Sequence, residues 1–312
     1  AAAVCYESPR QQPYGNLRQM NTPKKADGLL RRTLAERVVI ADGAMGTMLQ
    51  AANPSLSDFE NHEGCNEVLN VSRPDIVRSV HEEYLSAGVD AIETNTFGAN
   101  WSNLADYGIE DRIYELAFAG GKIAREAADA FSTPDKPRFV LGSLGPGTKL
   151  PSLGHTTYDN LKIAYYTAAK GLADSGCDAL LVETSQDLLQ VKAAVNGCRQ
   201  AIDEATHDIV LIAQVTVETT GTMLMGSEIG AALNALEPMG IDLIGLNCAT
   251  GPAEMSEHLR YLSKNAKVAI SVMPNAGLPQ LGPSGATYPL KPNQLATALD
   301  GFVTDYGISL IG

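Results

Sequence analysis

Short runs of apolar, often β-branched residues recur along the chain, and longer amphipathic stretches separate them. The runs show no alternation of apolar and polar positions, which is typical of strands buried on both faces of a parallel sheet. We therefore predict eight strands, at Val38–Ala41, Ala91–Glu93, Phe139–Gly142, Ala179–Glu183, Ile209–Val215, Leu243–Leu246, Val268–Val272 and Ile308–Ile311.

The stretches between these runs have the 3.6-residue period of amphipathic helices. We predict helices at Pro74–Ala87, Asp111–Ala130, Tyr158–Asp174, Leu188–Ala205, Glu228–Leu236, Ala253–Ser263 and Pro292–Tyr306. A further helix at Gly28–Glu36 precedes the first strand, and we expect it to cover the floor of a barrel formed by the strands. A glycine lies between several of these helices and the strand that follows, as expected where a helix ends in the left-handed conformation. These glycines are Gly88, Gly176, Gly240 and Gly307.

Strands and helices in strict alternation predict a (β/α)8 TIM barrel, with a doubly wound open sheet as the alternative fold. Polar, glycine-rich sequence follows nearly every strand, which favours the barrel because its loops surround a single mouth. We expect a flexible N-terminal arm at residues 1–25 and the barrel at residues 26–312, truncated after strand eight. The barrel in this chain is accordingly expected to lack the eighth helix.

Composition excludes several classes of protein. The net charge of −13, with no cluster of Lys or Arg, argues against nucleic-acid binding. No apolar run approaches the ~18 residues of a membrane-spanning helix, and the N-terminal residues lack a signal-peptide pattern. Five cysteines without paired spacing indicate reduced thiols and a cytoplasmic setting.

Acidic residues follow the first and fourth predicted strands. Asp42 and Gly43 come directly after the first strand, and Glu183 ends the fourth. Because the carboxyl ends of barrel strands meet at one mouth, both carboxylates are expected on one rim, where they suit an ammonium group. An Asp that caps the following helix is an equally good interpretation of Asp42.

The segments after the second and third strands are polar or glycine-rich. Thr94 and Asn95 belong to one of them and contact either a ligand or each other, since buried polar groups need partners. Gly145 lies in the other, which lacks the spacing of a P-loop and either offers backbone amides to a carboxylate or simply turns the chain. His155 in the same loop is interpreted as a loop hydrogen-bonder.

One cysteine occupies a position that differs from the others. Cys248 follows Asn247 at the carboxyl end of the sixth strand, whereas no other cysteine ends a strand. A cysteine is most often a small apolar residue. Its place on the polar rim makes Cys248 the candidate nucleophile or metal ligand.

Six of these segments together resemble the homocysteine S-methyltransferase family from about Leu30 to Gly312. They occur in family order, each at a strand end, and read DGAMGT, ETNTFGAN, GSLGPGTKLP, VETSQD, GLNCATGP and SVMPNAGLP. Within the family, the chain is most similar to the N-terminal homocysteine-binding domain of cobalamin-dependent methionine synthases. The betaine-dependent branch is less similar, since its members carry a Tyr where this chain has Gly98.

The resemblance implies a zinc ion held by three thiolates, with the sulfur of L-homocysteine as the fourth ligand. Cys248 matches the first thiolate, and the other two belong to a motif whose first glycine matches Gly312. One thiolate does not complete a tetrahedral zinc site. We therefore expect this chain by itself to hold no complete zinc site and to be inactive.

The resemblance also implies the remaining roles. Asp42 and Glu183 would hold the substrate ammonium, and Asn247 belongs to the same site. Backbone amides near Gly43 or Gly145, together with Thr94 and Asn95, would receive the carboxylate. The methyl donor would be methylcobalamin on a cobalamin-binding domain, and a folate-binding domain would complete the full-length polypeptide.

Two other functions remain open at the level of sequence. The first is a self-contained homocysteine methyltransferase that uses S-methylmethionine or betaine. The second is a non-catalytic binding module in which Cys248 has no chemical role.

Overall fold

The computed structural model describes residues 28–278, 280–282 and 285–312, so the predicted arm at 1–25 lies outside the described residues. Eight parallel strands form the central sheet in the order β1-β10-β7-β6-β5-β4-β3-β2. A bridge between Ala41 and Ala91 joins the two ends of this order and closes the barrel. The predicted TIM barrel is confirmed, and the open sheet is wrong. The strands are β1 Val39–Ile40, β2 Ala91–Glu93, β3 Phe139–Leu144, β4 Ala179–Ser185, β5 Val210–Val215, β6 Leu243–Asn247, β7 Ala269–Met273 and β10 Leu310–Ile311.

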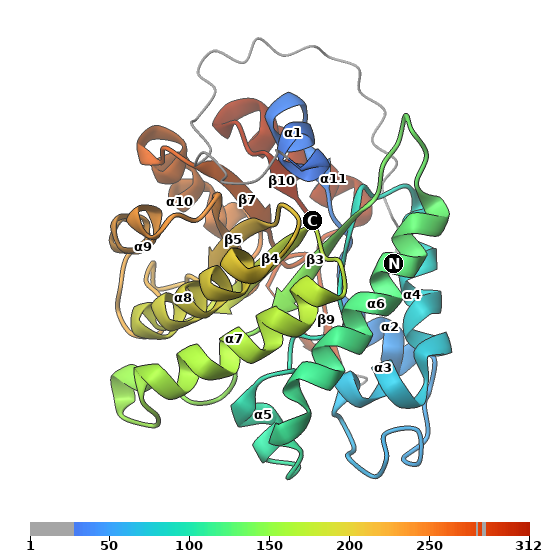
Figure 1. The fold of residues 1–312 in the computed structure, drawn as a ribbon. Helices are drawn as coiled ribbons and strands as arrows, with labels where there is room; N and C mark the ends of the chain where they lie inside the picture. The colour runs from blue at the N-terminus through green and yellow to red at the C-terminus, as the bar shows by residue number, and fades with distance from the viewer. Residues whose placement is uncertain (1–27, 279, 283–284) are drawn as a thin grey trace.

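The main helices cover the outside of the sheet. Figure 1 shows α6, α7 and α8 side by side on this outer surface, with α1 at the opposite end of the barrel from α5. Among the described residues no helix is long and apolar enough to cross a membrane. The helices are α1 Leu29–Glu36, α2 Met45–Ala51, α3 Leu69–Ser72, α4 Pro74–Ala87, α5 Trp101–Ala105, α6 Ile113–Phe131, α7 Tyr158–Asp174, α8 Leu188–Glu204, α9 Ile229–Leu236, α10 Pro252–Asn265 and α11 Pro292–Tyr306.

Most predicted elements match the structure to within two residues, but short elements in the loops were not predicted. These are α2, α3 and α5, an antiparallel hairpin of β8 and β9, and four 3-10 turns. The glycines expected to end helices all have positive φ, from 66° to 104°. The unpredicted elements have these bounds: β8 Gln280–Gly282, β9 Gly285–Thr287, and turns at Asn66–Val68, Glu110–Arg112, Pro151–Leu153 and Glu237–Met239.

Helix α1 closes the amino-terminal end of the barrel. Its Leu30 and Leu34 pack with the buried apolar side chains of the strands. Beside them, Arg31 bonds two carboxylates that immediately precede β5 and β6, at 3.0 Å to Asp208 and 2.6 Å to Asp242. The prediction that this helix covers the floor is confirmed.

Inward-facing side chains change character along each strand. Because alternate residues of a strand share one face, the inward positions of β4 are Ala179, Leu181 and Glu183. The first two belong to the apolar core inside the barrel. In neighbouring β3 the apolar Leu141 is likewise followed by Ser143. The barrel is therefore filled with apolar side chains at the floor and lined with polar ones at the mouth.

Candidate active site

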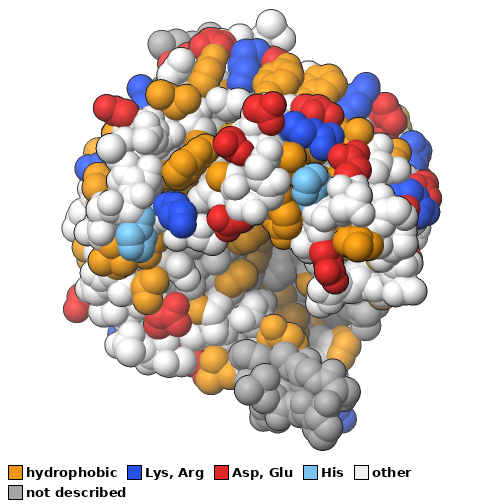
Figure 2. Space-filling model, turned by 90° about the horizontal axis from the view of Figure 1, so that it is seen from below, with side chains coloured by type: hydrophobic (Ala, Val, Ile, Leu, Met, Phe, Trp, Pro, Cys, Tyr) orange, Lys and Arg blue, Asp and Glu red, His pale blue; other side chains and the backbone are white. Residues whose placement is uncertain are grey.

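The mouth of the barrel is a hollow at the carboxyl ends of the strands. Figure 2 looks onto this face and shows the hollow near its centre, with hydrophobic side chains beside it. Three carboxylates line it, namely Asp42 after β1, Glu93 at the end of β2 and Glu183 in β4, with β3 between the last two strands. Sequence reasoning identified Asp42 and Glu183 but assigned no role to Glu93, which lies at the polar end of a three-residue strand.

Asp42 is buried and only half satisfied. Its Oδ1 accepts a hydrogen bond from the backbone N–H of Glu93 at 2.9 Å, whereas Oδ2 has no partner among the described residues. Burial raises the pKa of Asp42 well above its ordinary value; the bond from Glu93 opposes this shift and the charge of Glu183 adds to it. Helix α2 begins after Ala44 without a side-chain cap, so Asp42 is not a helix cap.

Glu183 is buried and held on both sides. Ser143 Oγ donates to its Oε1 at 2.5 Å, and Asn247 Nδ2 donates to its Oε2 at 3.2 Å. Burial raises the pKa of Glu183 to about 7, although the bond from Ser143 opposes this shift. Burial also raises the pKa of Glu93, and the nearby charges of Glu183 and Asp42 raise it further. A ligand that brings a positive charge would relieve the destabilisation of all three carboxylates.

Cys248 lies beside this acidic group, directly after β6. Its Sγ is 3.5 Å from Asn247 Nδ2 and 3.8 Å from Thr184 Oγ1. Burial raises the pKa of the Cys248 thiol to about 11; the charge of Glu183 adds to the effect and the bond from Thr184 opposes it. The other described cysteines, Cys65, Cys177 and Cys198, are buried. Cys248 is thus the one described cysteine that reaches the mouth.

Backbone strain is concentrated around the thiol. Thr184, Cys248 and Ala249 all have positive φ, between 55° and 56°. The left-handed conformation destabilises a non-glycine residue by roughly 1–2 kcal/mol, and it is most unusual for a β-branched residue such as Thr184. At Thr184 the pairing of β4 with β5 also shifts register. Such strain persists only where the surrounding contacts hold it in place, and it is concentrated at functional sites.

The segment after β2 forms an internal network. Thr94 Oγ1 bonds Thr96 Oγ1 at 2.6 Å and accepts from the backbone N–H of Ser143 at 3.0 Å. The amide of Asn95 donates to Asn66 O and Asn70 Oδ1. Both predicted side chains are therefore occupied inside the protein, which supports the network interpretation and leaves a substrate contact as an untested prediction.

Gly145 is likewise occupied. Its backbone N–H donates to Phe97 O at 3.1 Å, and its carbonyl accepts from Tyr165 Oη at 3.0 Å. A Cβ at this position would lie 2.5 Å from Phe97 O, so close packing explains the glycine. This geometry does not support a carboxylate-binding role for the Gly145 amide. By contrast, Gly43 is exposed and its N–H makes no hydrogen bond within the described residues.

Two further polar residues near the mouth have structural roles. Asp187 accepts from Ser152 and caps α8 through the backbone N–H of Leu189 at 2.8 Å. His155 Nδ1 accepts from the backbone N–H of Leu150, as its interpretation as a loop hydrogen-bonder requires. These hydrogen bonds do not direct either side chain toward the carboxylates at the mouth.

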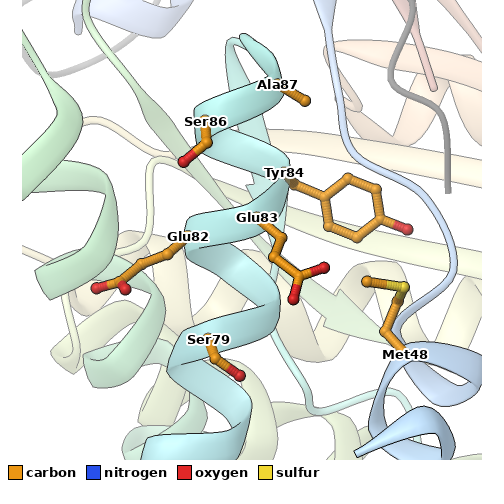
Figure 3. Close-up of a pocket in the computed structure, with 7 residues that line it drawn as sticks. All are labelled: Met48, Ser79, Glu82, Glu83, Tyr84, Ser86 and Ala87. Atoms are coloured by element: carbon orange, nitrogen blue, oxygen red, sulfur yellow. The ribbon is translucent and has the colours of Figure 1, made fainter.

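Two cavities are lined by residues outside the acidic group. One, of about 500 Å³, lies between α2 and α4, where Met48 faces Tyr84 and Glu83 (Figure 3). The other, of about 590 Å³, is mainly apolar and lies between α10 and α11, with Gly251 and Phe302 among its lining residues. Neither is lined by Asp42, Glu183 or Cys248.

A zinc ion needs about four ligands from thiolate, imidazole or carboxylate groups. Throughout residues 28–278, 280–282 and 285–312, no three His, Cys, Asp or Glu side chains are grouped so that they could hold a metal ion. Cys248 supplies a single thiol. The described residues alone therefore do not fit a zinc ion.

The fold is shared with solved structures. The homocysteine methyltransferase MmuM from Escherichia coli, in its metallated form, superposes with a TM-score of 0.72 at 22% identity, over 91% of this chain and 93% of that one. Its oxidised form gives a TM-score of 0.70 at 21% identity. At this level of identity the likeness concerns the barrel fold alone.

A family model settles the relationship. The model of homocysteine S-methyltransferases matches residues 39–312. The chain belongs to the homocysteine S-methyltransferase family. The chain is 62% identical over 279 residues to the methionine synthase of Mycobacterium tuberculosis and 61% identical over 283 residues to that of Mycobacterium leprae. The two matches cover 89% and 91% of this chain but only 23% and 24% of the length of the two relatives.

Proposed function

We propose that this chain is the homocysteine-binding methyltransferase domain of a methionine synthase. L-homocysteine would bind in the mouth and present its sulfur beside Cys248; transfer of a methyl group to that sulfur, with loss of the thiol proton, gives methionine. The observation that carries this proposal is the buried acidic group with the unpartnered Oδ2 of Asp42.

The acidic group suits the ammonium of an amino acid. An ammonium has three N–H donors and a positive charge. It would bond Asp42 Oδ2 and stabilise the ionised forms of Glu93 and Glu183, which burial destabilises. The N–H of Gly43, directly after Asp42, is a suitable donor for the carboxylate of the same ligand. Asp42 and Gly43 are adjacent residues, and the ammonium and carboxylate of an α-amino acid are attached to the same carbon atom. The two residues therefore suit the head group of an α-amino acid.

Zinc, the methyl donor and the partner domains are further parts of this proposal. The family resemblance makes Cys248 one ligand of a zinc ion, whose other ligands are to be sought outside the described residues. The methyl donor is methylcobalamin, carried on a cobalamin-binding domain of the same polypeptide, with folate bound by another domain. A cytoplasmic setting fits the unpaired thiols of the four described cysteines.

Exposed apolar side chains on the loops around the mouth support a macromolecular donor. Leu153 and Leu224 are each 54% exposed, Tyr288 is 50% exposed and Phe97 41%. Leu153, Leu224 and Phe97 lie in the segments after β3, β5 and β2, and Tyr288 follows β9 in the segment between β7 and α11. Apolar side chains gathered on one face are typical of a surface that another protein or domain covers.

Calorimetry on the full encoded protein tests the ammonium site. We expect L-homocysteine to bind and 4-mercaptobutanoate, which lacks only the amino group, to bind at least about tenfold more weakly. Equal affinity for the two compounds would contradict the proposed site.

Cys248→Ser should remove stoichiometric zinc while the fold is retained, because a hydroxyl is a poor substitute for a thiolate. Methionine formation with methylcobalamin, S-methylmethionine or betaine then distinguishes the donors.

A further inference from the structure

A tyrosine of α4 holds the turn between β1 and α2. Tyr84 Oη donates a hydrogen bond to the backbone carbonyl of Ala44 at 3.1 Å, although the two residues are 40 apart in the sequence. Ala44 immediately precedes α2 and follows Asp42 and Gly43, the two residues proposed to bind the head group of the substrate. Tyr84 therefore contacts the segment that carries this part of the candidate site.

The ring of Tyr84 packs against the same turn. A Cβ built on Gly43 would lie 3.4 Å from Tyr84 Oη and 3.9 Å from its Cε1, so the ring lies directly beside Gly43. Tyr84 also packs against a buried apolar cluster, as do Met45 and Met48 of α2. Figure 3 shows the ring extending from α4 toward Met48. Apolar packing thus fixes the ring, and the hydroxyl at its tip is directed at the turn.

The hydroxyl of Tyr84 stays protonated and can donate. Burial raises the pKa of Tyr84 to about 12, with smaller contributions from the charges of Asp42, Glu93 and Glu83. A phenol with this pKa keeps its proton throughout the neutral range, so it remains a donor to the carbonyl of Ala44. The contributions of Asp42 and Glu93 agree with the place of the ring beside the turn.

The two halves of the turn are fixed separately. Asp42 is held from the barrel, because its N–H donates to a carbonyl of β2 at 3.0 Å and its Oδ1 accepts from the N–H of Glu93 at 2.9 Å. Beyond Asp42, the bond from Tyr84 is the one side-chain bond that the described residues make to the backbone of Gly43 and Ala44. Because a glycine has no Cβ to restrict its dihedral angles, the direction of the Gly43 N–H depends on this bond.

We propose that Tyr84 is a positioning residue that fixes the turn after β1 and so directs the N–H of Gly43 at the carboxylate of an α-amino acid substrate. The inference rests on the proposed function for the identity of the ligand. Tyr84 acts through the backbone of Gly43 and Ala44 and is not itself a catalytic residue. It contributes to recognition of the carboxylate alone, because Asp42, which faces the ammonium, is held by other bonds.

Calorimetry on the full encoded protein with three thiols tests this division of roles. L-homocysteine has both head groups, 4-mercaptobutanoate lacks the ammonium, and 3-aminopropane-1-thiol lacks the carboxylate. Tyr84→Phe retains the ring and removes the hydroxyl. It should raise the Kd of the two thiols with a carboxylate by about three- to tenfold, as loss of one hydrogen bond implies. The Kd of 3-aminopropane-1-thiol should stay within about twofold of the wild-type value.

Tyr114→Phe is the matched control. Tyr114 lies on α6, and its hydroxyl donates to Asp174 at 2.9 Å. This variant also loses one tyrosine hydrogen bond, but the bond lies outside the turn after β1. All three thiols should bind it as they bind the wild type.

A second measurement does not depend on a ligand. Hydrogen exchange of the ligand-free protein, followed by mass spectrometry, should be about three- to tenfold faster in the peptide that covers α2 when Tyr84 is replaced by Phe. A peptide that covers β3 should exchange as in the wild type and reports that the fold is retained.

An equal rise in the Kd of all three thiols would overturn the inference, because a merely structural role would weaken the whole mouth. Unchanged Kd values in Tyr84→Phe, with a wild type that binds L-homocysteine, would also overturn it and leave the proposed function intact. A wild type that does not bind L-homocysteine would contradict the proposed function instead. The exchange of α2 then still decides the positioning role, which fails if exchange in Tyr84→Phe is no faster than in the wild type.

Discussion

Glu183→Gln should make the ligand-free, metal-free chain more stable at alkaline pH while it weakens homocysteine binding. Glu183 is buried, and burial raises its pKa from 4.5 to about 7. A neutral amide of the same size avoids the burial of a negative charge. Ser143 can accept from the new –NH₂ group, and Asn247 can still donate to the remaining oxygen. The variant therefore keeps its packing and both neighbours.

The pH dependence of this effect follows from the direction of the shift. A group with a raised pKa in the folded state contributes stability below its unfolded pKa, here about 4.5, and this stability is lost as the pH rises through about 7. A rise in pKa from 4.5 to about 7 corresponds to roughly 3 kcal/mol at pH 8. Because part of this is recovered by relaxation around the charge, we expect Glu183→Gln to gain about 1–3 kcal/mol at pH 8 and almost nothing at pH 5.

Urea unfolding at pH 5, 6, 7 and 8 measures this difference directly. Glu63→Gln is the matched control, because Glu63 is an exposed carboxylate on the loop between β1 and β2. The control should follow the wild type at every pH, while the free energy of unfolding of Glu183→Gln diverges from it above about pH 5. A Glu183→Gln variant that is less stable than the wild type at pH 8, or that shows the same pH dependence, would refute this reasoning.

Three further changes test other parts of the molecule. Asp42→Asn should raise the Kd for L-homocysteine about tenfold or more and leave that for 4-mercaptobutanoate unchanged, measured by calorimetry; equal losses for both would remove Asp42 from the ammonium site. Gly145→Ala should lower the free energy of unfolding by about 1–3 kcal/mol, because the new Cβ would meet Phe97 O at 2.5 Å; an unchanged melting temperature would contradict this. Arg31→Met should lower the free energy of unfolding by about 3–5 kcal/mol, because Asp208 and Asp242 lose their buried partner. Urea unfolding that matches the wild type would show that the floor of the barrel does not depend on these ion pairs.

Much of the barrel was predictable from the order of apolar and amphipathic segments. Helices at Pro74–Ala87 and Tyr158–Asp174 have the predicted bounds, because a 3.6-residue period and a Pro or Thr at the start are local signals. The loop elements were missed for the opposite reason. The hairpin of β8 and β9 has three-residue strands, which are too short to show a period.

The position of Cys248 at the mouth also follows from sequence, since a residue directly after a barrel strand must lie at its carboxyl end. The sequence likewise determined that Asp42 and Glu183 share this rim. Only the tertiary structure decided which polar groups remain available there. Gly145 has its amide occupied by Phe97 O, and Asn95 faces the interior, because both depend on neighbours from other segments.

The partners of the functional groups come from distant strands. Ser143 and Glu183 are 40 residues apart, and Glu183 and Asn247 are 64 apart. Hydrophobic periodicity specifies which face of a strand is buried, but it carries no information on which polar atoms meet across the barrel. Closure of the sheet brings these atoms together. The sequence alone therefore determined the barrel and the rim, while the contacts of Thr184 and the unpartnered oxygen of Asp42 were decided by the tertiary structure.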